Sequence, residues 1–406
     1  MEKTCAKNNL EFTAVVCEYN PFHLGHLHQL QRLARSYPDR SLLCLMSGNF
    51  VQRGEPAVLD KYTRAKEAIA GGADAVIGLP VPFAAANAER FCLGAVKLLS
   101  SIPAVKTLAF GTEYGTAEEF SALADLLVNE SDEWKAALKK RLEKGASFAA
   151  ARADAIQEVY PSFDERLYRL PNAALALGYA AAAKRLNAAF DLLPLPREGA
   201  GHDRGAADGF ASASFIRQGI YRGDAESVLP FLPEKTRADL PLCLSPSSRE
   251  KWDAMAYYAL IDGGREKLSR APDCSEGLEN AFFGAAKEVF SAEEVVRAVT
   301  SARYPAARLR RILSCNALSV TEENVKKFVS SPLYLSALAV NKAVAPAVFS
   351  ALSESGLPLL TRKGDEEKLP PLARECFACE ERADKIYSAL CGRKINPYAT
   401  VFAERA

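Results

Sequence analysis

The sequence predicts an α/β protein in which a parallel sheet flanked by helices is followed by a mainly helical part. Strand-like and helical segments alternate between Phe12 and Thr112, a pattern typical of parallel sheets. Polar, turn-forming motifs follow several of these strands, which is where α/β proteins bind ligands. Beyond Pro241 the pattern becomes predominantly helical. We therefore expect a catalytic domain in residues 1–244 and a helical domain in residues 245–406.

Size, composition and charge are those of an ordinary globular protein of two domains. The chain has 406 residues, of which 49% are hydrophobic and 25% charged, and its net charge is +1. Because this net charge is close to zero, any contact with nucleic acid requires a local basic patch. The N-terminal residues lack the order of a signal peptide, and no apolar run is long enough to span a membrane. We expect a cytoplasmic protein.

The ten cysteines are expected to be thiols, as is usual in a reducing compartment. Cys376 and Cys379 lie close together in the sequence, and Cys391 follows them. A structural zinc site needs four ligands, and no fourth cysteine or histidine lies nearby. Because the segment also has a helical pattern, packing is favoured over metal binding.

Four strands and three helices are predicted in the first part of the chain. Apolar, β-branched runs mark the strands, and apolar residues at helical spacing mark the helices. The strands are Phe12–Cys17, Ser41–Met46, Ala75–Gly78 and Thr107–Phe110, and the helices are His26–Ser36, Lys61–Ala70 and Ala85–Ser101. The carboxyl ends of parallel strands meet at one edge of the sheet, so the motifs that follow them should outline one site.

The segment Glu18–His28 joins the first strand to the first helix and holds three of the four histidines. A turn that opens a helix brings backbone N–H groups and the positive helix end together, which favours phosphate. His23 and His26, separated by Gly25, can reach the same anion. The alternative interpretation is that these histidines only cap the helix.

The loop Ser47–Pro56 follows the second strand and combines two glycines with an arginine and polar amides. Arg53 offers a planar fork for a carboxylate or phosphate. Lys61 and Arg64 follow on the next helix and share a face. We expect the substrate contacts here to come from Ser47, Gly48, Asn49, Arg53 and Lys61. The alternative is a solvent-exposed loop and helix face.

A second phosphate-binding turn is predicted at Ala211–Arg217. Ser212 and Ser214 precede an apolar helix, and Arg217 lies in its first turn. The hydroxyl and N–H groups can face an anion while the arginine supplies positive charge. Alone this pattern is an ordinary serine cap, but together with the upstream histidines it indicates a nucleotide site.

Three further segments lie between the two turns. Glu118–Glu158 is mainly helical and has no assigned chemistry. Asn172 follows a proline at the start of a helix, where asparagine is a common cap. A strand at Phe190–Leu193 leads into a glycine-rich loop that contains Arg197 and the last histidine, His202.

The helical part is expected to begin after a linker at Leu244–Ser248, with one further strand at Leu357–Leu360. Five arginines and no acidic residue lie between residues 297 and 320. Arg308 and Arg311 share a helix face while apolar neighbours point inward. A local basic face on a neutral protein is typical of nucleic-acid binding, and the expected contacts are Arg303, Arg308, Arg310 and Arg311. The alternative is a solvent-exposed charged helix.

These motifs resemble the tRNA(Met) cytidine acetate ligase family, within the His-x-Gly-His nucleotidyltransferase superfamily. The resemblance covers most of the chain, and its early motifs are specific. It is carried by Glu18–His26, Met46–Pro56, Gly71–Asp74, Ala88–Phe91, Phe110–Glu113, Pro171–Asn172, Gly199–Gly201, Ala211–Arg217 and the segment around Arg303–Arg311. It implies a Rossmann-like nucleotidyltransferase domain followed by a tRNA-binding helical domain.

The resemblance implies an enzyme that makes acetyl-adenylate from ATP and acetate. The acetyl group then passes to the exocyclic amine of the wobble cytidine in elongator methionine tRNA. The ATP ligands that it implies are Val16, Glu18, Tyr19, Asn20, Pro21, Phe22, His23, Gly25, His26, Gln29, Gly111, Asn172 and Arg197. His23, His26, Ser212, Ser214 and Arg217 are expected to stabilise charge on the phosphates. Mg²⁺ is expected to bridge the phosphates, with no protein ligand assigned.

Two other functions stay open from the sequence. One is a nucleotidyltransferase that makes another adenylated small molecule, against which the arginine-rich helical part argues. The other is a non-catalytic RNA-binding protein with a degenerate nucleotide pocket, against which the intact histidine turn argues. The chain departs from the family pattern in a shortened loop before His202, in Ala173 and in Gly78. These departures bear on the placement of His202 and Asn172.

Overall fold

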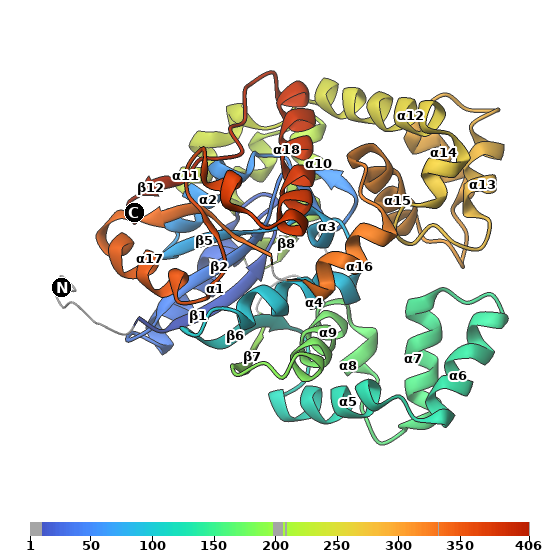
Figure 1. Ribbon diagram of the computed structural model, residues 1–406, viewed down its shortest axis with the longest axis horizontal. Helices are drawn as coiled ribbons and strands as arrows, with labels where there is room; N and C mark the ends of the chain where they lie inside the picture. The colour runs from blue at the N-terminus through green and yellow to red at the C-terminus, as the bar shows by residue number, and fades with distance from the viewer. Residues whose placement is uncertain (1–9, 198–205, 208, 332, 406) are drawn as a thin grey trace.

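The computed structural model describes residues 10–197, 206–207, 209–331 and 333–405. Its centre is an eight-stranded sheet surrounded by helices (Figure 1). The strands of this sheet are β1 Phe12–Cys17, β2 Ser41–Ser47, β5 Ala75–Leu79, β6 Val105–Thr112, β7 Asp191–Pro196, β10 Leu335–Asn341, β11 Leu359–Leu360 and β12 Val401–Ala403. Two hairpins lie outside it, β3 Phe50–Val51 with β4 Glu55–Pro56, and β8 Ala206–Ala207 with β9 Phe210–Ala211.

The order of the sheet is β11-β10-β5-β2-β1-β6-β7, and β12 pairs with β10. The five neighbouring strands β5, β2, β1, β6 and β7 are parallel to one another. The chain runs outward from β1 through β2 to β5, and then returns to place β6 on the other side of β1. Ligands bind at the carboxyl ends of the two strands that flank such a reversal, so β1 and β6 define the expected position of the site.

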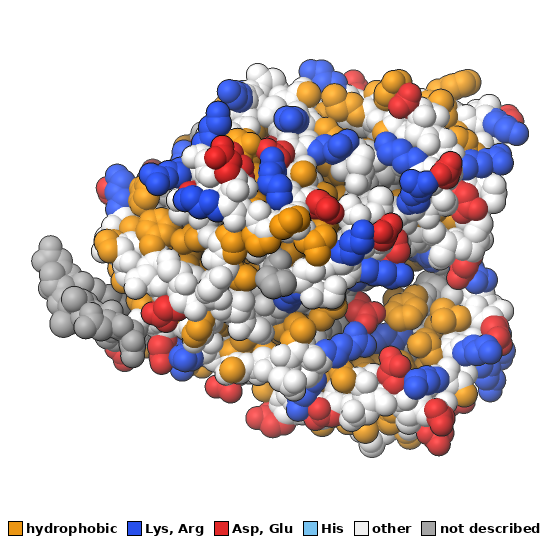
Figure 2. Space-filling model, in the orientation of Figure 1, with side chains coloured by type: hydrophobic (Ala, Val, Ile, Leu, Met, Phe, Trp, Pro, Cys, Tyr) orange, Lys and Arg blue, Asp and Glu red, His pale blue; other side chains and the backbone are white. Residues whose placement is uncertain are grey.

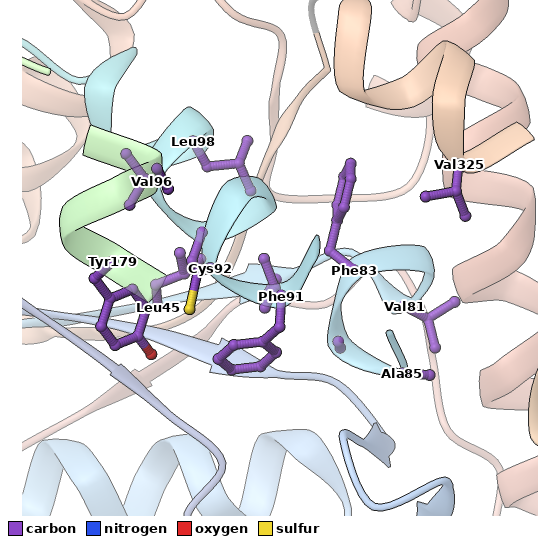
Figure 3. Packing of buried hydrophobic residues seen from close by; sticks show 14 of the residues in the cluster. Leu45, Val81, Phe83, Ala85, Phe91, Cys92, Val96, Leu98, Tyr179 and Val325 are labelled. Carbon is purple, nitrogen blue, oxygen red and sulfur yellow. The ribbon is translucent and has the colours of Figure 1, made fainter. Parts of the chain in front are cut away.

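Both faces of the sheet are buried because alternate residues of each strand enter different cores. Leu43 and Leu45 of β2 pack into one core, whereas Leu42, Cys44 and Met46 pack into the other. Figure 3 shows part of the first core, which includes Leu45, Phe83, Phe91 and Tyr179. Near-continuous apolar strands are what a doubly covered parallel sheet requires.

The helices occupy most of the remaining chain. They are α1 Leu24–Ser36, α2 Lys61–Ala70, α3 Val81–Ala84, α4 Ala88–Ser100, α5 Ala117–Asn129, α6 Asp132–Glu143, α7 Phe148–Val159, α8 Arg166–Arg169, α9 Pro171–Arg185, α10 Ala213–Tyr221, α11 Glu234–Asp239, α12 Pro246–Ser269, α13 Leu278–Ala285, α14 Ala292–Val299, α15 Ala306–Leu318, α16 Glu322–Ser330, α17 Ala345–Ser353 and α18 Pro371–Cys391. The single helix expected at 85–101 is wrong in its start, because Asn87 caps α4 and separates it from α3.

The predicted strands are confirmed with small shifts at their ends, and β10 and β12 were missed. β10 is a short, almost fully buried apolar run, and such runs have no periodicity that distinguishes a strand from a buried helix. It pairs antiparallel with β5, where Val340 lies opposite Ala75. The expected boundary after residue 244 is therefore not a boundary of the sheet, since β10, β11 and β12 all lie beyond it.

The mainly helical part is the group α12–α16, which lies beside the sheet at the right of Figure 1. The linker expected at Leu244–Ser248 is wrong. Leu244 is buried and donates its N–H to Val58, and Ser245 caps α12. Among the described residues, none of the helices combines the length and apolarity needed to cross a membrane.

Candidate active site

A cavity of about 1460 Å³ begins at the carboxyl ends of β1 and β6 and continues between α7, α9, α15 and α16. On the face shown in Figure 2, the surface is hollowed between the lobe that holds α6 and α7 and the body above it. Lysine and arginine side chains lie along this hollow. The cavity is larger than most small-ligand pockets.

The histidine turn forms the floor of this cavity at the end of β1. His23 caps α1, and its Nδ1 accepts the N–H of Gly25 at 3.1 Å. The Nδ1 of His26 accepts the N–H of His23 at 3.4 Å, and the two rings stack with centroids 3.7 Å apart. A Cβ on Gly25 would lie only 3.0 Å from the His23 ring. Glycine therefore allows the two imidazoles to stack.

The two imidazoles are neutral in the unliganded protein. Burial, together with the nearby charges of Arg197 and Arg217, lowers the pKa of His23 to about 3. Burial also lowers the pKa of His26 well below its usual value, and the closeness of the His23 ring and of Arg197 acts in the same direction. Since both Nδ1 atoms accept hydrogen bonds, the protons lie on Nε2. Each ring can therefore donate one hydrogen bond to an anion.

Aromatic packing supports the turn from below. Tyr19 lies edge-on to Phe22 at 4.9 Å and contacts the His26 ring at 4.8 Å. Phe22 is 1% exposed, and neither it nor Pro21 is among the residues that line the cavity. The expectation that Pro21 and Phe22 contact ATP is corrected, because these side chains support the turn. The other expected ATP ligands do line the cavity.

The second predicted phosphate turn lines the same cavity as the histidines. Ser212 caps α10, and Ser214 and Arg217 line the same cavity. Arg217 donates to the carbonyl of Asn20 at 2.8 Å and lies 3.6 Å from Glu55. This hydrogen bond connects α10 directly to the histidine turn, so segments almost two hundred residues apart form one site.

Gly111, Asn172 and Arg197 also meet, at the end of β6. Arg197 donates its Nη1 to the Asn172 side-chain oxygen at 3.4 Å, and its stem lies over Gly111. The interpretation of Asn172 as a helix cap is wrong. The carboxylate of Glu113 caps α9 instead, since it accepts the N–H groups of Asn172 at 3.1 Å and Ala173 at 3.0 Å.

The loop after β2 contributes Arg53 to the cavity, and a buried arginine holds this loop in place. Arg64 is fully buried and donates to the carbonyls of Leu59 at 2.9 Å and Ser47 at 3.2 Å, and also to those of Glu18 and Gly48. The alternative interpretation, a solvent-exposed helix face, is therefore wrong for Arg64. Arg64 binds together the ends of β1 and β2.

Four other residues expected at the substrate lie away from the cavity. Lys61 is 3% exposed, and its Nζ contacts Asp384 of α18 at 2.6 Å. Asn49 bridges the same Asp384 and the N–H of Lys61, at 2.8 Å each. Ser47 and Gly48 are absent from the cavity lining. The expectation that they contact the substrate is corrected. Their role is structural, because they join the loop to α18.

The arginine-rich helix has acidic partners that its sequence does not show. Arg303 contacts Glu276 at 2.8 Å, Arg310 contacts Glu293 at 3.0 Å and Arg311 lies 4.0 Å from Asp273. The expectation of an uncompensated basic face is therefore corrected. Arg303, Arg308 and Arg311 line the cavity, whereas Arg310 does not. α15 packs directly on Gly54, where a Cβ would lie 2.4 Å from the Arg311 backbone nitrogen.

Several lining residues were missed by sequence reasoning. Phe148 and Arg152 lie in the segment that had no assigned chemistry, and Arg90, Arg185 and Lys326 come from three other helices. No local motif marks any of them. His202 lies outside the described residues. All described cysteines are free thiols, and no set of three potential metal ligands is found among the described residues.

The chain is similar to known proteins in both sequence and structure. Residues 10–399 match a family model described as HIGH nucleotidyl transferase. A tRNA(Met) cytidine acetate ligase from Thermoanaerobacter sp. (strain X514) is 34% identical over 362 residues, covering 87% of this chain and 90% of that protein. One from Caldanaerobacter subterraneus subsp. tengcongensis is 33% identical over 383 residues, covering 91% and 94%.

Two solved structures of Thermotoga maritima TmcAL are also similar. The complex with alpha-thio ATP has a TM-score of 0.86 and 26% identity, and the apo form has 0.88 and 27%. Each comparison covers 97% of this chain and 100% of the other. The fold and the paired-histidine turn define a nucleotidyltransferase of the HIGH class. Within that class, the chain belongs to the tRNA(Met) cytidine acetate ligase family, and the resemblance expected from the sequence is confirmed.

Proposed function

We propose that this protein activates acetate with ATP and acetylates the wobble cytidine of elongator methionine tRNA. In the first step an acetate oxygen attacks the α-phosphorus, and pyrophosphate leaves. In the second step the exocyclic amine attacks the acetyl carbon, AMP leaves and the amine loses a proton. The observation that carries the proposal is the stacked pair His23–His26 facing Arg217 across one cavity.

The first step needs positioning and charge stabilisation, and this site supplies both. The Nε2–H groups of His23 and His26 donate hydrogen bonds to phosphate oxygens, while Arg53, Arg197 and Arg217 supply positive charge. Ser212 and Ser214 add hydroxyl donors on the opposite side. All of these groups line the cavity at the ends of β1 and β6, where the fold class binds nucleotides.

We further propose that two amides hold the acetate carboxylate. The Nδ2 of Asn20 and the Nε2 of Gln52 have no hydrogen-bond acceptor among the described residues. Buried N–H groups usually have an acceptor, and both residues line the cavity beside Arg53 and Arg217. A small carboxylate bound there would supply both missing acceptors.

The second step places tRNA in the part of the cavity that α15 lines. Arg303, Arg308 and Arg311 line that part, and we assign RNA contact to them and to the helical group α12–α16 rather than to a domain that begins at residue 245. Mg²⁺ would accompany the nucleotide and neutralise phosphate charge. A cytoplasmic location is part of the proposal, because the tRNA and ATP that it needs are found there.

The decisive experiment is ATP–pyrophosphate exchange with and without acetate, followed by acetylation of elongator methionine tRNA. We expect exchange that depends on acetate. His26→Ala should abolish it, because one of the two phosphate donors is lost, while tRNA binding stays at the wild-type level. Exposed Arg362→Gln is a matched surface control.

Other results would support the competing functions. ATP–pyrophosphate exchange at the same rate with and without acetate would indicate an adenylyltransferase for another small molecule. Tight tRNA binding without any exchange would indicate a non-catalytic RNA-binding protein.

A further inference from the structure

The part of the cavity farthest from the histidines is rich in cations. Over the whole cavity, eleven of the described lining residues are arginine or lysine and five are aspartate or glutamate. Most cations at this end have a carboxylate partner. These pairs are Arg90–Glu322, Arg185–Glu89, Arg303–Glu276, Arg311–Asp273 and Lys326–Glu322.

Two cations at this end have no carboxylate partner among the described residues, and they lie on opposite walls of the cavity. Arg152 of α7 makes no hydrogen bond or ion pair with any described residue, although Glu89 and Arg185 act on its charge. Arg308 of α15 donates to the carbonyl of Asp273 at 2.9 Å and to the hydroxyl of Ser275 at 3.0 Å, with no carboxylate partner in the described chain. Both are thus available to phosphate groups.

An exposed aromatic ring accompanies Arg152. Phe148 lines the cavity and is 51% exposed, and it lies four residues before Arg152 on the same face of α7. The hairpin of α6 and α7 that carries it is held by local contacts. Trp134 stacks on Tyr160, and Arg169 of α8 contacts Asp154 at 2.8 Å. The Phe148 ring therefore projects from a helix that these contacts hold in place.

We propose that Phe148 stacks on an unpaired base of the tRNA anticodon loop while Arg152 and Arg308 bind the phosphates on either side of it. This inference rests on the proposed function and adds a second RNA contact, on the lobe opposite α15. Single-stranded RNA is recognised by aromatic stacking combined with cations along the backbone, and the excess of cations suits a polyanion. His23 and Phe148 line the same cavity, so one loop can reach both.

The test measures binding of a synthetic anticodon arm of elongator methionine tRNA, with acetate-dependent exchange measured in parallel. Phe148→Ala should weaken binding about tenfold, the loss of one stacked base, and Phe148→Tyr should retain it. Exchange should stay at the wild-type rate in both, which also shows that they fold. Phe402→Ala is the matched control, because Phe402 is equally exposed but lies outside the cavity.

Salt dependence separates the roles of the cations from that of the ring. Arg152→Gln and Arg308→Gln should each reduce the slope of log Kd against log salt concentration by roughly 0.7. Phe148→Ala should leave this slope unchanged, and Arg362→Gln should change neither slope nor affinity.

Three results would overturn the inference. Equal binding by Phe148→Ala and Phe402→Ala would exclude the stack. An equal loss of binding to the duplex stem without its loop would exclude an unpaired base. A parallel loss of exchange in Phe148→Ala would make its role structural. Absence of exchange in the wild-type protein would instead contradict the proposed function.

Discussion

The paired imidazoles of His23 and His26 depend on the residues around them rather than on their own side chains. Gly25 leaves room for the stack, and Tyr19 packs against it. Burial keeps both rings neutral, so they act as hydrogen-bond donors and the positive charge comes from arginines. The sequence predicts an anion site at this turn, but it does not show that burial keeps the two imidazoles neutral.

At the residue scale, the low pKa of His23 predicts a pH dependence of stability. The unfolded chain binds a proton near the ordinary pKa of 6.5, whereas the folded chain does so only near about 3. The free energy of unfolding therefore falls as the pH is lowered through this window, by about 1.4 kcal/mol per pH unit. In His23→Gln this contribution should vanish. Urea unfolding at several pH values between about 4.5 and 6.5 measures this pH dependence. Parallel curves of unfolding free energy against pH for the wild-type protein and His23→Gln would contradict the prediction.

The unpartnered Nε2 of Gln52 leads to a second prediction at this scale. Gln52→Ala should raise the KM for acetate about tenfold in the exchange reaction, the effect of about one hydrogen bond to a charged group. The KM for ATP should stay unchanged, because no phosphate contact is assigned to this side chain. An equal rise in both constants would show that Gln52 only shapes the loop.

At the scale of elements, buried charges connect the loop after β2 to α18, far away in the sequence. Lys61 at the start of α2 lies against Asp384, and Asn49 joins the same carboxylate. Although burial alone would lower the pKa of Lys61, the Asp384 carboxylate raises it above its usual value. Lys61 is therefore a permanent cation whose removal leaves a buried carboxylate unpaired.

Lys61→Met should accordingly destabilise the protein by about 3 kcal/mol, as is typical when one partner of a buried ion pair is removed. Lys61→Met combined with Asp384→Leu should recover part of this loss, because no unpaired charge remains. Lys327→Met is the matched control, since its pair with Glu323 is exposed and should contribute less than about 1 kcal/mol. Thermal or urea unfolding of the wild-type protein and these three variants measures their free energies of unfolding. Equal destabilisation by Lys61→Met and Lys327→Met would contradict it.

At the scale of the whole molecule, the sheet draws strands from both halves of the chain. β10 completes it by pairing with β5, and β11 and β12 pair with β10. Helices α12–α16 are inserted between β7 and β10 in sequence and supply one wall of the cavity. The chain thus enters the sheet both before and after this helical group.

A fragment of residues 1–244 should therefore fail to fold cooperatively, although the sequence predicts it as a domain. Without β10, the buried edge of β5 would be left unpaired and prone to association. Size-exclusion chromatography and the sharpness of thermal unfolding provide the measurement. A monomeric fragment with a cooperative transition would show that residues 1–244 are an independent domain after all.

The sequence alone predicts the α/β class, the strands β1, β2, β5, β6, β7 and β11, and two turns, at His23 and Ser212, as anion sites. These are local properties, because strand runs, turns and helix starts depend on residues close together in the chain. Only the tertiary structure decided that Lys61 and Asn49 are buried, that Glu113 caps α9, and that acids from other helices pair with the arginines of α15. It also placed Phe148 and Arg152 in the cavity. Such placements depend on contacts between residues far apart in the sequence, which no local pattern encodes.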